Sequence, residues 1–269
     1  MTTRLDDTGL TFSDASLQAI AAGQLPGYLF GYTMSTAGAS TTMSITAGKA
    51  QDSTGVQLMT LTAIAKTTAA WLLGTAAGGL DTGAIAVNSW YHFYVIRRPD
   101  TGVVDVVFSL SATAPTLPAA FTQFRRIGSG RTNPSSQWTK FSQNGDEFLW
   151  DVASADVVGF TGSTSIQPAT LLVPLGVKTN AIITAAGLIG GAGTNARGYV
   201  FSPDINLAIA LASLSNMNFG GTGAANTQFW SQLTIRANTA SQVYFSIDAA
   251  NGSVYINTHG YIDTRGRVA

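Results

Sequence analysis

Short runs of alternating apolar and polar residues, separated by turn residues, extend along most of this 269-residue chain. Between residues 41 and 46, Met43 and Ile45 lie on one side of an extended segment, and the segment 56–62 has apolar residues on both faces. Strands that recur about every 8 to 12 residues, with turn signals between them, are typical of sandwiches and barrels. The pattern therefore predicts a mainly β protein with two β-sandwich or jelly-roll-like domains.

Three pairs of these runs are predicted to form antiparallel hairpins. They join residues 91–98 to 103–110, 137–142 to 147–152, and 242–248 to 253–256. The first contains a Pro-Asp-Thr-Gly turn, in which Pro99 fixes φ and Gly102 accepts the left-handed conformation. The third contains Asn251-Gly252, and Asn-Gly is the strongest short hairpin signal in a sequence.

Helical signals are few. Ser13 has the chemistry of an N-cap for a helix over residues 15–22. The segment 63–73 contains helix-forming residues, but two consecutive β-branched threonines weaken that interpretation. Residues 205–214 form the longest apolar run and are compatible with either a buried helix or strands. No fixed-period repeat is found, so a solenoid is not expected.

A change of composition near the middle of the chain indicates a domain boundary. Residues 153–167 are rich in glycine, serine and threonine and end at Pro168. The length allows one large or two medium domains. We therefore predict an N-terminal docking segment over residues 1–23, a first β-domain over 24–152 and a second over 153–269.

Charge narrows the range of functions. Only 10% of the residues are charged, and 14 basic residues balance 14 acidic ones. Nucleic-acid binding requires a basic face that displaces counterions, so neutrality argues against that class of partner. A chain without net charge is also expected to cover part of its surface in an assembly.

The chain contains no cysteine, which excludes disulfides and zinc–thiolate sites. No stretch offers about 18 consecutive apolar residues, so membrane insertion is not expected. The first residues combine Arg4 with Asp6 and Asp7 and lack the apolar core of a secretory signal.

Four sequence blocks resemble proteins of bacteriophage particles. The opening LDDTGLTFSDASLQAIAA, residues 5–22, resembles a module of tail-fibre and other virion proteins. Residues 89–132, with an aromatic strand, the Pro-Asp-Thr-Gly turn and a final RRIGSGRT, resemble a domain of structural proteins of tailed phages and prophages of α-proteobacteria. GDEFLW at 145–150 and GYIDTRGR at 260–267 resemble later blocks of the same proteins. Two positions depart from the usual pattern, Gly130 and Tyr261.

The resemblance implies a non-enzymatic structural protein on the virion surface, of the tail-fibre or tail-tip type, with no cofactor and no metal. Residues 1–23 would dock to another virion protein, with Leu10, Phe12, Leu17 and Ile20 as candidate contacts. The protein would assemble with copies of itself, as a trimer, and contribute to host adsorption by contacting a surface glycan. A head fibre or capsid-decoration protein is the alternative, followed by a polysaccharide depolymerase and a non-viral carbohydrate-binding module.

A depolymerase would need two carboxylates about 5 to 9.5 Å apart. The candidates are Asp146, Glu147 and Asp151, of which Glu147 and Asp151 share one face of a predicted strand, while Asp146 belongs to a turn. Solvated charges in a turn and at a strand edge are the favoured interpretation, so no catalytic residue is predicted.

Neither histidine has the spacing of a metal site. His92 lies within a predicted aromatic strand and His259 beside a glycine in a predicted turn, and a structural role is favoured for both. The glycine-rich residues 187–193 lack the strand-loop-helix context of a phosphate site and are interpreted as a loop.

The aromatic residues offer the clearest binding chemistry, because Trp and Tyr stack on sugar rings as readily as they fill sandwich cores. The five tryptophans are Trp71, Trp90, Trp138, Trp150 and Trp230. For Trp90, Trp138 and Trp150, which lie in or beside predicted strands of one domain, a place in the core is favoured.

A basic cluster has two interpretations. Its members are Arg97, Arg98, Arg125, Arg126 and Arg131. They could contact an anionic lipopolysaccharide, or they could pair across strands or subunits with Asp100, Asp105, Asp146 and Glu147. The second interpretation is favoured, because the planar guanidinium suits bidentate pairing at interfaces.

Overall fold

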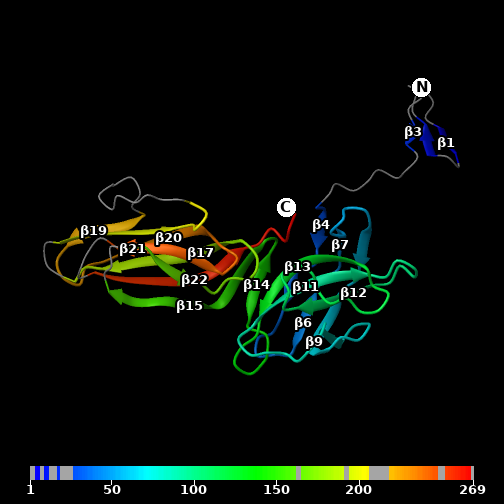
Figure 1. Ribbon diagram of the computed structural model, residues 1–269, viewed down its shortest axis with the longest axis horizontal. Helices are drawn as coiled ribbons and strands as arrows, with labels where there is room; N and C mark the ends of the chain where they lie inside the picture. Colours follow the sequence, from blue (N-terminus) through cyan, green and yellow to red (C-terminus); the bar gives the residue numbers. More distant parts are fainter. Residues whose placement is uncertain are drawn as a thin grey trace.

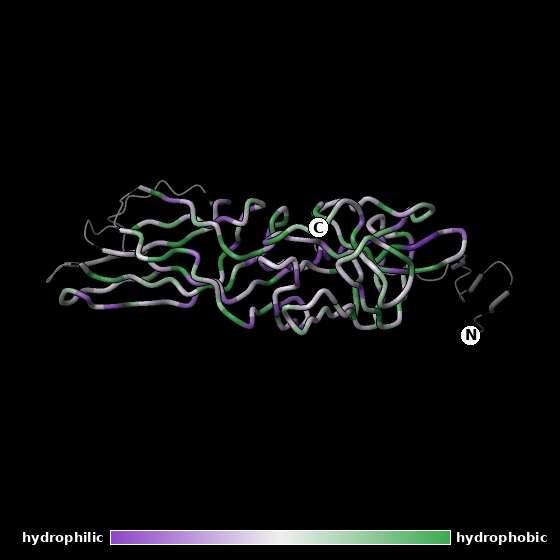
Figure 2. The backbone as a smooth tube through the Cα atoms, turned by 90° about the horizontal axis from the view of Figure 1, so that it is seen from below, coloured by the Kyte–Doolittle hydropathy of each residue, from purple (hydrophilic) through white to green (hydrophobic). Residues whose placement is uncertain are grey.

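The computed structural model describes residues 27–161, 165–190, 194–205, 218–247 and 252–267, with only the backbone of three short strands before residue 27 and of residues 194–197 and 222. Every regular element in these ranges is a β-strand, which confirms the prediction of a mainly β protein of the β-sandwich type. No described segment forms a helix that is long and apolar enough to span a membrane. The strands from β4 onward build two lobes along the long axis of an elongated body (Figures 1 and 2).

Three short strands near the N-terminus pair with one another in a sheet of their own. They are β1 (Arg4–Asp6), β2 (Gly9–Thr11) and β3 (Leu17–Gln18), and both pairings are antiparallel. The helix predicted over residues 15–22 is therefore wrong at Leu17–Gln18, because pairing with β2 satisfies the backbone of this dipeptide in a ladder. Ser13, its predicted cap, and the rest of that segment lie outside the described residues.

The first lobe contains a seven-stranded sheet and a three-stranded sheet. The larger has the order β13 (Gln123–Arg131), β11 (Trp90–Arg97), β12 (Val104–Ser109), β10 (Ala77–Leu80), β9 (Ile64–Ala70), β6 (Thr42–Ile45) and β5 (Met34–Ser35). The smaller has the order β4 (Leu29–Gly31), β7 (Gly48–Gln51) and β8 (Leu58–Leu61). Strand β8 packs against β11 and β12, so the two sheets share one core.

Local patterns account for several of these strands. The predicted hairpin around the Pro-Asp-Thr-Gly turn is confirmed by β11 and β12, which pair antiparallel, and Gly102 has a φ of 73° in the turn. Met43 and Ile45 of β6 are both buried, as the alternation predicts.

The helical interpretation of residues 63–73 is wrong, since this segment contains strand β9. Ile64 and Lys66 turn into the interior on alternate positions, which is the period of a strand and not of a helix. The two threonines that follow Lys66 favour the extended conformation because they are β-branched.

The second lobe is a sandwich of a five-stranded and a four-stranded sheet. The first has the order β14 (Phe141–Asn144), β15 (Glu147–Thr161), β22 (Ser253–Ile262), β17 (Thr179–Leu188) and β20 (Gln228–Ala237). The second has the order β16 (Gln167–Thr170), β21 (Gln242–Ile247), β18 (Thr194–Phe201) and β19 (Phe219–Gly223). Phe160 of β15 meets Phe245 of β21 edge-on across the sandwich, with ring centroids 5.1 Å apart.

The second predicted hairpin is confirmed by β14 and β15, whereas the third is wrong. Strands β21 and β22 follow each other along the chain, but β21 pairs with β16 and β18 and β22 pairs with β15 and β17. Each strand buries alternate apolar residues, such as Phe245 and Ile256, in the interior of the sandwich. Covering both faces of that core outweighs the local turn preference of Asn-Gly.

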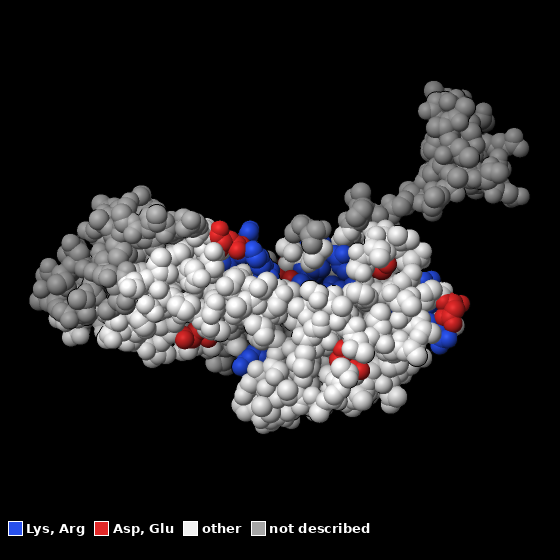
Figure 3. Space-filling model, viewed as in Figure 1, with Lys and Arg blue, Asp and Glu red and all other residues white. Residues whose placement is uncertain are grey.

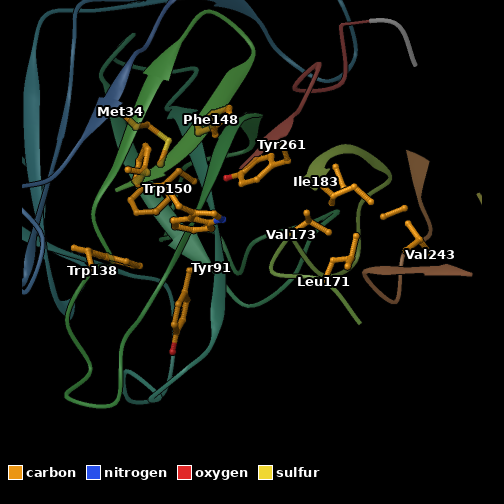
Figure 4. Close-up of a cluster of buried hydrophobic side chains, with 14 of the residues drawn as sticks. Met34, Tyr91, Trp138, Phe148, Trp150, Leu171, Val173, Ile183, Val243 and Tyr261 are labelled. Atoms are coloured by element: carbon orange, nitrogen blue, oxygen red, sulfur yellow. The ribbon is translucent and has the colours of Figure 1, made fainter. Parts of the chain in front are cut away.

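Strand β15 connects the lobes without interruption, and the boundary predicted between residues 152 and 153 falls inside it. Its first residues pair with β14 beside the first lobe, and it continues along β22 into the second lobe (Figure 1). Tyr261 of β22 stacks on Phe148 of β15, with ring centroids 4.9 Å apart, and donates a hydrogen bond to the Ser129 carbonyl of β13 at 3.2 Å. Buried side chains of both lobes therefore form one cluster (Figure 4).

The residues after β22 return to the first lobe and form a polar junction. Arg126 of β13 donates two hydrogen bonds of 2.7 Å to the Asp263 carboxylate. Arg125 donates to the Gly266 carbonyl at 2.7 Å, and Arg265 donates to the Gly31 carbonyl of β4 at 3.2 Å. We call these residues the junction cluster, and on this face Lys and Arg side chains gather between the two lobes (Figure 3).

Candidate functional site

The structure separates one tryptophan from the other four. Trp138 and Trp150 are buried, and Trp90 packs beside Trp150 with ring centroids 5.7 Å apart, so the core placement predicted for these three is confirmed. Trp71 is half-buried. Trp230 is 72% exposed on the outer face of the five-stranded sheet. A single exposed aromatic residue is common, but one that adjoins other aromatic or apolar side chains on the same face marks a candidate binding site.

The register of three neighbouring strands places a second aromatic residue opposite Trp230. Ala186 of β17 pairs with Trp230 of β20 on one side and with Tyr255 of β22 on the other. Alternation of side chains puts all three on the outer face. Because adjacent strands lie about 4.8 Å apart, the backbones that carry the two aromatic residues are separated by about 9.6 Å, with the small Ala186 between them.

The result is a groove of about 270 Å³ whose floor is β17. It is lined by Ala186, Gly187, Leu188, Gln228, Phe229, Trp230, Tyr255 and Asn257. We call this the aromatic groove. None of its lining residues carries a charge, and its polar groups are the side-chain amides of Gln228 and Asn257 and the Tyr255 hydroxyl.

The same register supplies further polar side chains along the groove. In the next row toward the junction, Thr184 of β17 pairs with Gln232 of β20 and with Asn257 of β22. The Thr184 Oγ1 and His259 Nε2 atoms are 2.7 Å apart, which holds the threonine hydroxyl in place. The surface around the two aromatic rings is therefore built of neutral hydrogen-bonding groups.

The sequence contains a signal for this site. Along β20, Phe229, Leu233 and Ile235 turn toward the interior, and the intervening positions are polar except for Trp230. A tryptophan on the polar set of an alternating strand is expected to face solvent. The prediction treated the five tryptophans together and did not consider on which face of its strand Trp230 lies.

Two of the three carboxylates considered for a depolymerase are engaged in ion pairs. Asp146 pairs with Arg265, with 3.2 Å between Nη2 and Oδ1, and also with Arg267. Asp151 pairs with Lys140 at 3.0 Å. Glu147 and Asp151 share one face of β15 but are four residues apart, which corresponds to about 13 Å of strand. That separation exceeds the range of about 5 to 9.5 Å for a glycosidase pair.

Four arginines of the basic cluster, Arg97, Arg98, Arg125 and Arg126, engage protein groups, but only in part those predicted. Arg98 pairs with Asp100, one of the predicted partners, at 2.8 Å, but within one turn and not across strands. Arg126 pairs with Asp263, and Asp105 pairs with Lys66. The predicted sets contained neither Asp263 nor Lys66. Burial opposes the charge of Arg126, but the adjacent Asp263 carboxylate outweighs this effect and raises its pKa.

The remaining predicted candidates occupy structural positions or lie outside the described residues. Of the glycine-rich residues 187–193, which were predicted to form a loop, Gly187 and Leu188 lie at the end of strand β17. Residues 191–193 are outside the described ranges. Among the candidate docking contacts, Leu10 lies on β2 and Leu17 on β3, whereas Phe12 and Ile20 are outside the described residues.

The histidines are held by hydroxyl groups. The Nδ1 atom of His92 lies 2.9 Å from the Ser129 hydroxyl, in the interior between the lobes. In the part of the chain that the structure describes, no group of three or more His, Cys, Asp or Glu side chains is arranged to hold a metal ion.

Acidification is expected to destabilise the protein through His92. Burial, and secondarily the positive charge of Arg126, lower its pKa from 6.5 to about 4. Since the unfolded chain takes up this proton more readily than the folded one, stability falls as the pH decreases from about 6.5 to about 4. The total contribution is about 3 kcal/mol.

Urea denaturation at several pH values measures this effect. In His92→Gln the part of the stability loss that occurs between pH 6.5 and pH 4 should be absent. An unchanged pH profile in the variant would show that His92 is not the responsible group.

A larger hollow of about 670 Å³ lies beside β18 and β20, but its charged groups pair with one another. Asp204 accepts from Lys178 at 2.7 Å and lies 3.7 Å from Arg236. The aromatic groove differs from this hollow in that none of its lining residues is charged.

No protein-family model matches this sequence, and no curated protein matches it at a significant level.

Proposed function

We propose that this protein is a non-enzymatic structural component of a bacteriophage particle, a tail-fibre or tail-tip protein that attaches by its N-terminal segment and contributes to host adsorption. It acts on the virion surface, in contact with other virion proteins and with copies of itself in a trimer. The four sequence blocks that resemble phage structural proteins support this proposal, and they lie in both lobes and in the N-terminal segment.

The observation that carries the proposal is the separate N-terminal sheet. Strands β1, β2 and β3 contain three, three and two residues, and among the described strands they pair with one another in a sheet of their own. A sheet of this size offers too few side chains for a core, because even a two-stranded hairpin of ordinary length is marginal alone. Such an element is stabilised best by a partner, as a docking segment would be.

The two-lobed body supports the proposed contribution to host adsorption. Its lobes share one continuous core, so a rigid β-body presents the aromatic groove on its second lobe. Net neutrality and the low content of charged residues fit a chain that is covered in part by other subunits.

Immunogold electron microscopy of intact phage, with antibody raised against the purified chain, tests the proposal. Label at the tail or its fibres is the expected result, and pre-immune serum is the control. Label over the head would instead favour a head fibre or decoration protein. Particles without label, produced from a genome that carries the gene, would overturn the virion assignment.

A further inference from the structure

We propose that the aromatic groove binds a neutral oligosaccharide, with one pyranose ring seated over Ala186 between Trp230 and Tyr255. The proposal rests on the proposed function in so far as the saccharide would belong to the host surface, although the binding itself is a property of the isolated chain. It assigns a ligand class and a set of contact residues to a surface of the second lobe.

The shape of the groove fits a single sugar ring. The floor residue is alanine, whereas its two cross-strand neighbours are the large aromatic residues Trp230 and Tyr255. A small residue between two large ones leaves room for one ring and not for a bulky group, in agreement with the volume of about 270 Å³. Aromatic faces gain dispersion energy from the aliphatic C–H face of a pyranose, because both surfaces are flat and apolar.

The polar side chains at the edge of the groove match the hydroxyl groups of a sugar. A pyranose has hydroxyl groups around the rim of its apolar faces, and each hydroxyl both donates and accepts hydrogen bonds. Amide side chains also do both, and Gln228 and Asn257 line the groove at either side of the aromatic pair. Gln232 and Thr184 extend this set by one row along β17 and β20, toward the adjoining ring of a short oligosaccharide.

The absence of charged side chains in the lining of the groove favours a neutral saccharide. No Lys, Arg, Asp or Glu lines the groove, so an anionic or cationic sugar finds no partner for its charge there. A neutral saccharide has no charge to desolvate, and its hydroxyl groups can exchange water for the amide side chains of the groove, whereas a buried unpaired charge is far more costly. Binding is therefore expected to be insensitive to salt, in contrast to recognition by arginines.

A second copy of this chain is the competing occupant of the groove. The core of a protein interface is a contiguous apolar patch, often with an aromatic anchor. Here the outward neighbours of Trp230 along β20 are Gln228 and Gln232, and Asn257 is exposed on β22. This polar surround favours a hydroxyl-rich ligand over an apolar subunit surface.

Isothermal titration of the purified full chain with cellotetraose, maltotetraose and an N-acetylglucosamine tetramer tests the proposal. At least one probe should bind, with equal affinity at low and high salt. Trp230→Ala and Tyr255→Ala should each weaken that binding by about tenfold or more. Thr234→Ala, on the same strand and the same outward face as Trp230 but outside the groove, should leave the affinity unchanged.

Three outcomes would overturn the proposal. They are the absence of binding for all three probes, an equal affinity of the wild type and Trp230→Ala, and a Trp230→Ala variant that loses self-association in light scattering. The last would assign the face to an interface between copies. Since Trp230 is exposed, its variant should fold with an unchanged melting temperature, which makes these results interpretable.

Failure of this inference and failure of the proposed function are distinguishable. Labelled virions without saccharide binding would remove the ligand assignment and leave the virion assignment intact. Saccharide binding that depends on Trp230, together with unlabelled particles, would keep the groove as a binding site and reject the virion role.

Discussion

Replacement of Asp263 by asparagine should lower the free energy of unfolding by about 3 kcal/mol at neutral pH, because it leaves the buried charge of Arg126 without its counter-ion. The pair joins the segment after β22 to β13 of the first lobe through two hydrogen bonds of 2.7 Å. Only 12% of the Arg126 side chain and 2% of the Asp263 side chain are exposed. Asparagine has the shape of aspartate, so the change tests the charge and not the packing.

Asp263 also accepts a hydrogen bond from the Arg265 backbone N–H at 2.8 Å. Burial favours its neutral form, but Arg126 and this hydrogen bond prevail and lower its pKa. The stabilisation is therefore present above the pKa of an unfolded aspartate and is lost in strong acid. Below that range the wild type and Asp263→Asn should become similar in stability.

Urea denaturation followed by tryptophan fluorescence measures the change. Asp100→Asn is the matched control, since the Arg98–Asp100 pair has side chains that are 39% and 56% exposed and should contribute nothing measurable. An equal effect of both substitutions would contradict the role assigned to burial. A folded second lobe that detaches from the first in Asp263→Asn would appear as a second unfolding transition.

Replacement of Asp105 by asparagine should be at least as damaging, with a loss of about 3 to 5 kcal/mol. Lys66 and Asp105 are 0% and 1% exposed, and both carboxylate oxygens lie 3.0 Å from Nζ. Lys66 also donates to the carbonyls of Leu72 and Gly74, at 2.8 and 2.9 Å, and Asp105 accepts from the Gly74 backbone N–H. The pair therefore anchors the connection between β9 and β10 to β12.

The effect of this substitution should depend on pH. Burial lowers the pKa of Lys66, and Asp105 opposes the shift, so its removal lowers the pKa further. The Lys66 ammonium of the folded variant then releases its proton more readily than that of the unfolded chain. The stability of the variant should therefore rise as the pH increases toward the pKa of an ordinary lysine. A deficit that stays constant up to alkaline pH would show that the charge on Lys66 is not its cause.

The double variant Lys66→Met, Asp105→Leu is the control for the buried charge. Apolar residues of similar volume remove both charges at once, so part of the stability should return relative to Asp105→Asn. Recovery is limited by the two loop carbonyls and the Gly74 N–H, which lose their partners. A double variant that is less stable than Asp105→Asn would assign the main contribution to these hydrogen bonds.

Local signals predicted the elements whose partners are near in sequence. The hairpin of β11 and β12 follows from an alternating run on each side of a turn that contains Pro99 and Gly102. The Asn251-Gly252 signal was equally strong, but β21 and β22 joined different sheets because each has an apolar face to bury in the sandwich. The helical interpretation of residues 63–73, which the two threonines already weakened, is wrong for the related reason that the neighbouring strands place Ile64 and Lys66.

The aromatic groove likewise depends in part on local pattern and in part on tertiary structure. Alternation along β20 is enough to place Trp230 on its polar face, but the groove exists only because Ala186 and Tyr255 are brought beside it by β17 and β22. Strand β17 lies far before Trp230 in the sequence, and strand β22 lies well after it. No local pattern specifies which three outward residues share a row.

The sequence by itself therefore determined the β class, two of the hairpins and the aromatic character of the core, since these depend on side-chain period and turn chemistry within a few residues. Only the tertiary structure decided which sheet each strand joins, that Arg126 meets a carboxylate 137 residues away, and that Ala186 and Tyr255 lie beside Trp230. Those outcomes depend on how the two faces of each sheet are covered, and the covering residues come from distant parts of the chain.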